Sequence, residues 1–371
     1  MYFRCCYLMR SIIQKLFLQA VILFSATHVI AQPNWPSPEV EKMYRNAREY
    51  VAAGNFKDAI ITYKQAIKLA PDVMILYRDL GDALSRSGNY DEAEKVLTPL
   101  LTKPGADVQC FLLLAQTHAA RKNTKSAIAA LKKGVTKFPA SGLLYHETGN
   151  VFYLEKKQEA ALNAWLDGIS KEPAFAENYF DAANIYLSAD KVLWGIIYGE
   201  MFLEMQHDTT GDDALKNKLF KAYKTMFDNF AQGEAPQYGK PSKHTTVNSF
   251  ESAVQQVYSS LTPVVSDGIT TENLTMVRTR FLMEWGTTYS KKYPFSLFSY
   301  LDNVIRSGRF DMYNEWLFGK AESAAEYKAW NEFHEGDMQR FLQWKSAYQF
   351  TPARNDFYND RNMDGIGKLT K

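Results

Sequence analysis

Histidine, cysteine and carboxylate side chains are where chemistry would be sought first in this chain. Beyond residue 31 the sequence has five histidines and one cysteine, and none stands at the spacing of a metal site such as His-Glu-x-x-His or Cys-x-x-Cys. His334 precedes Glu335, but no second histidine follows at the required spacing. There is no Gly-x-Ser-x-Gly turn for a serine nucleophile and no glycine-rich phosphate loop. We therefore expect no catalysis, no cofactor and no metal.

One segment near the C-terminus has part of the pattern of a calcium loop. Asp360, Asn362 and Asp364 place side-chain oxygens at alternate positions ahead of Gly365, as in the first half of such a loop. The complete loop needs a glutamate at its twelfth place, where this chain has Lys371. We therefore predict a frayed polar tail over residues 352–371. Whether these oxygens bind any cation stays open.

The first 31 residues have the composition of an export signal. Arg4, Arg10 and Lys15 form a basic head without acidic residues, and an apolar run follows over residues 16–26. This run is shorter than the roughly 20 residues that a membrane-spanning helix needs. We predict cleavage near Ala31, export to the periplasm or outer envelope, and no transmembrane segment in the mature chain. Met9 is an alternative start, because the basic head is retained there.

Composition limits what the rest of the chain can be. Lys and Arg total 43 and Asp and Glu 41, and three of the basic residues belong to the export signal, so the remainder carries a net charge of −1. This balance argues against nucleic-acid binding, which requires a basic excess. An aromatic content of 14% excludes a disordered chain. Cys110, the one cysteine left, cannot form an internal disulfide, and its apolar surroundings predict a buried side chain.

A 34-residue period organises residues 40–209. Ala59, Ala93, Ala127 and Ala161 are each 34 residues apart. Small residues recur with the same period at Ala47, Gly81, Ala115, Gly149 and Ala183, and large ones at Tyr77, Phe111, Tyr145 and Tyr179. Such a period indicates stacked copies of one supersecondary unit.

Each period predicts a pair of short helices. In the first period, apolar residues at helical spacing run from Tyr44 to Val51, and Gly54 interrupts them. A second run begins at Phe56 and closes before Pro71, because proline does not continue a helix. Small residues let the two helices cross closely. One such unit cannot bury its apolar face alone, so the units must stack into a superhelix.

This pattern resembles the tetratricopeptide repeat. The segments at residues 54–59 and 88–93 are close to that family's turn between helices, and the spacing of Tyr77, Gly81 and Leu84 matches its helix positions. Four clear units begin near Val40, Met74, Val108 and Gly142. A fifth, over Ala176–His207, has glycines at 195 and 199 where alanine and an aromatic residue belong, so we predict a degenerate unit. The resemblance implies an all-α, right-handed superhelical solenoid that binds other proteins, and it does not identify the client.

In such solenoids the first helix of each unit faces a concave groove. Aromatic, amide and arginine side chains there suit an extended peptide, whose backbone needs hydrogen-bond partners. The residues that we expect to bind a protein or peptide are Tyr44, Arg48, Arg78, Asp82, Arg86, Gln116, His146, Asn150, Tyr153 and Asn184. We therefore predict a non-catalytic scaffold or adaptor. An ordinary solvated face is the alternative interpretation of these residues.

After residue 209 the period stops and an aromatic-rich helical module follows. We predict a capping helix over residues 210–231, a linker over 232–247 and a module of about four or five helices over 248–351. Its tryptophans are Trp285, Trp316, Trp330 and Trp344. Helical spacing of the large apolar residues favours core packing. A carbohydrate-binding site or an enzyme site in this module is the alternative function. The sequence identifies neither the partner nor the oligomeric state.

Overall fold

The structure is a computed structural model, and it describes residues 35–189, 191–206, 212–233, 249–348, 350–354 and 358–360. The predicted export signal with its cleavage site, residues 234–247 of the predicted linker, and Asn362 and Asp364 lie outside these residues. Within the described residues all regular elements are helices, as expected for the all-α class. The chain divides into two compact units, residues 1–88 and 89–371, and each is described by itself.

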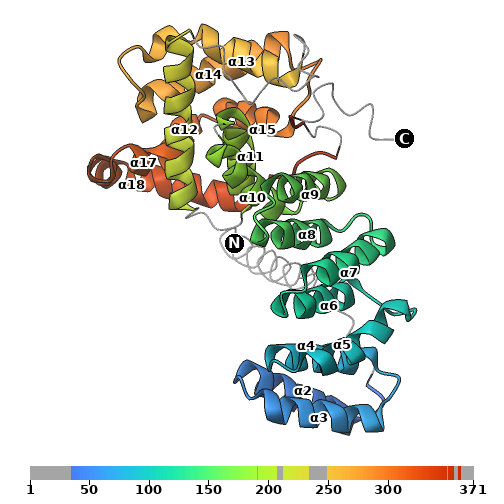
Figure 1. The fold of residues 1–371 in the computed structure, drawn as a ribbon. Coiled ribbons are helices and arrows are strands. Elements are labelled where there is room, and N and C mark those ends of the chain that lie inside the picture. Colours follow the sequence, from blue (N-terminus) through green and yellow to red (C-terminus); the bar gives the residue numbers. More distant parts are fainter. Residues whose placement is uncertain are drawn as a thin grey trace, which may run out of the picture. The chain divides into compact units, whose positions relative to one another are not determined.

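The first unit contains α2 (Pro38–Ala52), α3 (Phe56–Leu69) and α4 (Met74–Arg86), drawn in blue in Figure 1. Ser37 caps α2 by accepting a hydrogen bond from the backbone N–H of Val40 at 3.2 Å. Gly54 adopts a φ of +74° between α2 and α3, a conformation that glycine reaches without strain. Ala47, Ala59 and Ala66 are completely buried, so the helices cross at small residues, as predicted.

The second unit continues the repeat with helices that begin at 34-residue intervals (Figure 1). First helices begin at Val108, Gly142 and Ala176 and second helices at Tyr90, Thr124, Gln158 and Val192. They are α5 (Tyr90–Leu97), α6 (Val108–Ala120), α7 (Thr124–Lys137), α8 (Gly142–Leu154), α9 (Gln158–Lys171), α10 (Ala176–Ser188) and α11 (Val192–Met205). After α5 the chain tightens into a 3₁₀ turn, η1 (Thr98–Thr102), where Pro99 interrupts the helix. The period read from the sequence is therefore the spacing of the helices, and Cys110 is buried as predicted.

The fifth repeat keeps both helices despite its unusual glycines. A Cβ atom on Gly195 would lie 2.5 Å from Leu187 Cδ2, and one on Gly199 would lie 2.7 Å from Leu219 Cδ2. Both distances are far below van der Waals contact. The glycines at these two places therefore allow leucines of neighbouring helices to approach the α11 backbone.

The helices that follow the repeats share one hydrophobic core with them. They are α12 (Asp213–Ala231), α13 (Phe250–Ser260), η2 (Thr262–Val265), α14 (Thr271–Thr288), α15 (Ser296–Arg306), α16 (Phe310–Asn314), the π-helical turn η3 (Glu315–Gly319), α17 (Lys320–Glu322) and α18 (Ala324–Ala347). Figure 1 shows α11 in the middle of this group, with α12, α14 and α15 around it. From Val192 to Glu204 every residue of α11 except Phe202 is buried. A helix buried on all sides belongs to the interior.

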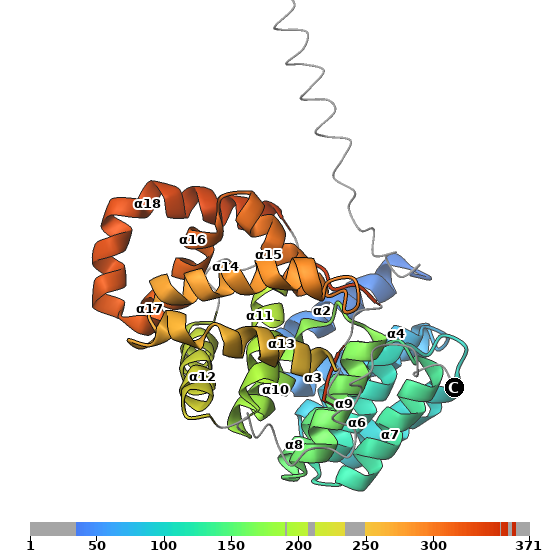
Figure 2. The ribbon, with the colours of Figure 1, turned by 90° about the horizontal axis from the view of Figure 1, so that it is seen from above.

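Phe333 of α18 departs from the predicted core packing, whereas Phe341 is buried and Trp330 and Trp344 pack against the core. Trp285 and Trp316 are buried, but Phe333 is 86% exposed and Tyr348 is 44% exposed. Within α18 only Met338, Phe341 and Lys345 are buried. Figure 2 shows α17 and the first part of α18 at the outer rim of the unit. The spacing of these residues predicts an apolar stripe, but it does not tell whether another helix covers it.

The C-terminal tail also departs from expectation at the residues that can be described. Tyr358 is 4% exposed and Asn359 is 3% exposed, so residues 358–360 are not frayed. The reason is that the Tyr358 ring stacks on the Phe250 ring, with ring centroids 4.2 Å apart. No helix of the described residues is both long and apolar enough to cross a membrane.

Candidate functional site

Three carboxamide side chains stand at the same place on the first helices of three successive repeats in the second unit. Gln116 lies on α6, Asn150 on α8 and Asn184 on α10, each 34 residues after the last. The three helices are neighbours in space, α6 packing beside α8 and α8 beside α10. Gln116 is exposed, and Asn150 and Asn184 are half-buried. We call these residues the carboxamide column.

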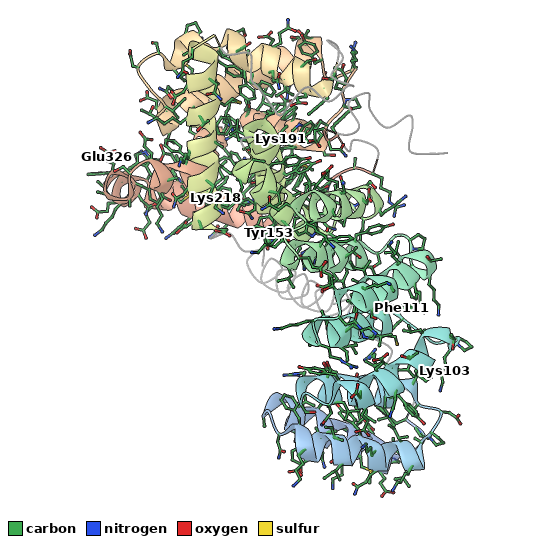
Figure 3. All side chains as sticks on the ribbon, in the orientation of Figure 1. Lys103, Phe111, Tyr153, Lys191, Lys218 and Glu326 are labelled. Atoms are coloured by element: carbon green, nitrogen blue, oxygen red, sulfur yellow. The ribbon has the colours of Figure 1, made fainter. Side chains whose placement is uncertain are left out.

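The last member of the column is contacted by the helix after the repeats. Lys218 of α12 donates a hydrogen bond to Asn184 Oδ1 at 2.7 Å, and Asn184 Nδ2 donates to the carbonyl of Phe180 at 2.9 Å. Figure 3 labels Lys218 on α12, beside the repeats, and Tyr153 at the end of α8. Tyr153 is 51% exposed, and its ring lies 5.9 Å from that of Trp165. Asn184 is therefore partly engaged within the chain, whereas Gln116 and Tyr153 are open to solvent.

His146 is held in its charged form beside the column. Its Nε2 lies 2.8 Å from Asp181 Oδ2, and its Nδ1 lies 3.7 Å from Glu147 Oε1. Burial disfavours the charge on this imidazole, but the hydrogen bonds and charges of the two carboxylates outweigh it and raise the pKa of His146 to about 9. The side chain is therefore an imidazolium at neutral pH and links α8 to α10.

The first unit contains the same contact at the equivalent position. Tyr44 and Asp79 stand 102 residues before His146 and Asp181, which is three repeat periods. The Tyr44 hydroxyl donates to Asp79 Oδ2 at 2.9 Å. Burial and the neighbouring Asp79 raise the pKa of Tyr44. In each unit, a ring with a polar atom on one first helix therefore contacts an aspartate on the next first helix. Neither aspartate is among the residues predicted to line the groove, although their common spacing is visible in the sequence.

The charged residues predicted for the groove in the first unit have contacts of their own. Arg78 Nε donates to Asp79 Oδ1 at 3.0 Å. Arg86 lies 3.6 Å from Asp82 and its guanidinium is 5.0 Å from the centre of the Phe56 ring. Arg48 lies over the Tyr44 ring at 5.9 Å. Burial raises the pKa of Asp82 against the opposing effect of Arg86. Tyr44, Arg48, Arg78, Asp82 and Arg86 therefore belong to the first unit, and Gln116, His146, Asn150, Tyr153 and Asn184 to the second. One continuous groove across both sets stays a prediction.

A buried ionic cluster in the second unit was not predicted from the sequence. The Arg278 guanidinium of α14 is 1% exposed and donates to Glu200 of α11 and to Asn314. The Tyr313 hydroxyl donates to the same Glu200 oxygen at 2.7 Å. Burial raises the pKa of Glu200, and Arg278 acts in the opposite direction. The signal that could have revealed this cluster is the pair Glu200 and Glu204, four residues apart in an otherwise apolar helix.

Glu204 forms the second half of this cluster. Lys345 of α18 donates to Glu204 Oε2 at 2.7 Å, and both side chains are almost completely buried. Lys345 and Lys216 both lie over the Trp316 ring, at 4.6 and 3.8 Å from its centre. Burial lowers the pKa of Lys216 to about 8. These charges are paired or shielded by aromatic rings, which is the arrangement of a structural cluster.

Two hollows open near α15 and α18, with volumes of about 190 and 510 Å³, and both are lined by Tyr348, Phe350 and Thr351. Glu204 and Lys345 line the smaller one, but the Glu204 side chain has no exposed surface and its carboxylate is turned to Lys345. It therefore presents no accessible acid to a ligand. Among the described residues, no three histidine, cysteine, aspartate or glutamate side chains are grouped to hold a metal ion.

The geometry defines the class of protein, which is an all-helical repeat protein built from stacked helix pairs with a 34-residue period. Residues 44–107 and 78–142 match the family model described as Tetratricopeptide repeat. Residues 44–142 thus consist of tetratricopeptide repeats, and the helices after residue 142 lie outside that match.

Two curated human proteins are similar to part of the chain. Protein O-mannosyl-transferase TMTC1 is 22% identical over 176 residues, which cover 46% of this chain and 20% of that protein. Antiviral innate immune response effector IFIT1 is 23% identical over 152 residues, covering 35% of this chain and 32% of that protein. The chain thus spans a third of these relatives or less. The solved structure of TTC0263, a TPR protein of Thermus thermophilus, is 17% identical with a TM-score of 0.38, covering 49% of this chain and 98% of that one.

Proposed function

We propose that this chain is a non-catalytic scaffold that binds an extended segment of a partner protein along the first helices of its repeats. The observation that carries the proposal is the carboxamide column. A carboxamide offers two N–H donors and one acceptor oxygen, which are the groups that an extended backbone requires. The repeat thus supplies, at regular intervals, side chains that bind a peptide through its main chain.

The spacing of the column suits an extended peptide. Packed helices lie about 8–10 Å apart, and an extended chain advances about 3.3 Å per residue. Successive column members would therefore meet backbone groups about three residues apart. His146 is already paired with Asp181, so it fixes the two helices rather than supplying a free charge. Recognition through the main chain is tolerant of partner sequence, and exposed side chains such as Tyr153 would add selectivity.

A pair of matched variants tests this proposal. Gln116→Ala with Asn150→Ala removes two members of the column and leaves Asn184, which Lys218 contacts. Gln65→Ala with Gln158→Ala removes two exposed carboxamides from second helices, α3 and α9, as a control. The full chain is purified from its native extract after crosslinking, and the linked peptides are mapped by mass spectrometry. We expect crosslinks on α6, α8 and α10 that fall by about tenfold in the first variant, a loss of about 1.4 kcal/mol, and persist in the control.

Two results would contradict the proposal. One is a set of crosslinks that avoids the first helices altogether. The other is equal capture by the wild type and by Gln116→Ala with Asn150→Ala, provided that both melt at the same temperature.

We further propose that the chain acts in the periplasm or at the outer envelope. The basic head, the short apolar run and the small residues before Gln32 support this location. Fractionation of the source cells followed by mass spectrometry of the N-terminal peptide tests it. We expect a mature N-terminus near Gln32 in the envelope fraction. An N-terminus at Met1 or Met9 in the cytoplasmic fraction would contradict it.

A further inference from the structure

The segment Tyr358–Asp360 is not helical, yet it contacts the rest of the second unit at three separate points. We call this segment the tail tripeptide. The first point is the Tyr358 ring, which is parallel to Phe250 within 4° at a centroid distance of 4.2 Å. Tyr293 and Phe295 present their rings at steep angles to it, with centroids 6.3 and 5.9 Å away. These three rings form an aromatic seat for one side chain.

The second point is a backbone contact. The Tyr198 hydroxyl of α11 donates to the carbonyl oxygen of Tyr358 at 2.6 Å, and this contact is buried. This hydrogen bond holds the main chain of the segment and does not depend on any side chain of the segment. A buried hydroxyl and a buried carbonyl would each be costly without a partner.

The third point is a cationic site for the Asp360 carboxylate. The Tyr186 hydroxyl of α10 donates to Asp360 Oδ1 at 2.6 Å, and the Lys191 ammonium forms an ion pair with Oδ2. Figure 3 labels Lys191 between the repeats and the helices that follow them. Tyr186 and Lys191 belong to the fifth repeat, whereas the aromatic seat belongs to the later helices. The site thus reads an aromatic residue and, two residues later, a carboxylate.

The tail tripeptide is bound in the manner of a peptide ligand. One ring, one carbonyl and one carboxylate anchor it, and the groups that receive them come from two parts of the chain that are far apart in sequence. Ordering a short segment costs conformational entropy, which its contacts must offset. Its covalent attachment provides a high local concentration, which keeps the site filled.

We propose that Tyr358–Asp360 is a releasable intramolecular ligand, and that its seat binds in trans a peptide in which an aromatic residue is followed two places later by an acidic one. This site is separate from the carboxamide column. It does not depend on the proposed function.

The test uses the full chain with Tyr358→Ala and Asp360→Ala, which empties the seat. The probe is a fluorescently labelled synthetic peptide with the sequence of residues 355–363. The matched control chain has Thr351→Ala with Arg354→Ala, two exposed residues before the tail tripeptide. We expect fluorescence anisotropy to show the peptide binding at least about tenfold more tightly to the emptied chain than to the wild type or the control, because the tethered ligand no longer competes.

The probe peptide itself supplies the second arm. Replacing its tyrosine with alanine, or its second aspartate with lysine, should weaken binding to the emptied chain by about tenfold or more. Lys191→Glu in the emptied chain should have the same effect.

Three results would overturn the proposal. A folded, emptied chain that binds the peptide no more tightly than the wild type shows that the seat takes no ligand in trans. Equal binding of the altered peptides shows that the seat does not read these side chains. An emptied chain that loses cooperative unfolding shows that the tail tripeptide is a fixed part of the core.

Discussion

His146 shows how the repeats fix a charge between neighbouring first helices. Because Asp181 and Glu147 raise the pKa of His146 to about 9, protonation stabilises the folded chain. This contribution is fully present below the unfolded pKa of about 6.5 and is lost as the pH rises through 9. The side chain is 15% exposed, so after allowance for solvent screening it amounts to about 2 kcal/mol.

We predict that His146→Gln flattens the dependence of stability on pH. The free energy of unfolding should fall between pH 6.5 and 9 by about 2 kcal/mol less than in the wild type. Urea unfolding at the two pH values measures this difference. Asp181→Asn, which removes the main partner, should give the same flattening. A pH dependence equal to that of the wild type in both variants would refute the role of this pair.

Arg278 and Glu200 form a deeply buried ion pair, and each depends on the other. We predict that Arg278→Met lowers the free energy of unfolding by about 3–5 kcal/mol, because the Glu200 charge is left buried without its cation. Arg278→Met combined with Glu200→Leu should recover most of this loss, since an apolar pair avoids the desolvation of both ions. Chemical denaturation of the two variants is the measurement.

A surface ion pair supplies the control for this comparison. Arg306→Ala breaks the contact with Asp302, where the Arg306 side chain is 74% exposed, and should leave the unfolding midpoint almost unchanged. If the double variant were no more stable than Arg278→Met alone, the lost charge pairing would not explain the destabilisation.

At the scale of helices, glycines inside different helices have different roles that the sequence does not distinguish. A Cβ on Gly149 of α8 would lie 2.2 Å from Nε1 of the buried Trp165. A Cβ on Gly286 of α14 would have no atom within 4 Å. The first glycine is required for packing and the second is not.

We predict opposite effects for the same substitution at these two positions. Gly149→Ala should lower stability by roughly 1–3 kcal/mol, because the Trp165 indole must move. Gly286→Ala should raise stability by about 0.5–1 kcal/mol through helix propensity alone. Thermal unfolding of the two variants checks the signs, and a stabilising Gly149→Ala would contradict the close contact.

The sequence predicts where the repeat helices lie, but it does not predict the burial and the contacts of every residue. The 34-residue period places the repeat helices because small and large residues recur at fixed phases. Glycine and proline mark their ends. The period cannot show that Phe333 faces solvent, because burial depends on a partner helix far away in sequence. The period also cannot show that Tyr44 contacts Asp79 or that His146 contacts Asp181, since these contacts depend on the distance between first helices.

At the scale of the second unit, α11 belongs at once to the last repeat and to the core of the later helices. We predict that its amide hydrogens exchange only when this unit unfolds as a whole. The free energy of exchange of α11 should equal the global value, whereas α5, which lies at the edge of the unit, should exchange at a lower free energy. Native-state hydrogen exchange with mass spectrometry measures both. Exchange of α11 well below the global value would show that the repeats and the later helices open separately.

The complete burial of α11 also limits how the array can change in length. A further repeat stacked after the fifth would need an open face on α11, and the later helices already occupy it. Insertion or loss of whole repeats is compatible with the fold only before α10. The number of repeats can therefore vary only on the N-terminal side of the array, while the end that is joined to the later helices stays constant.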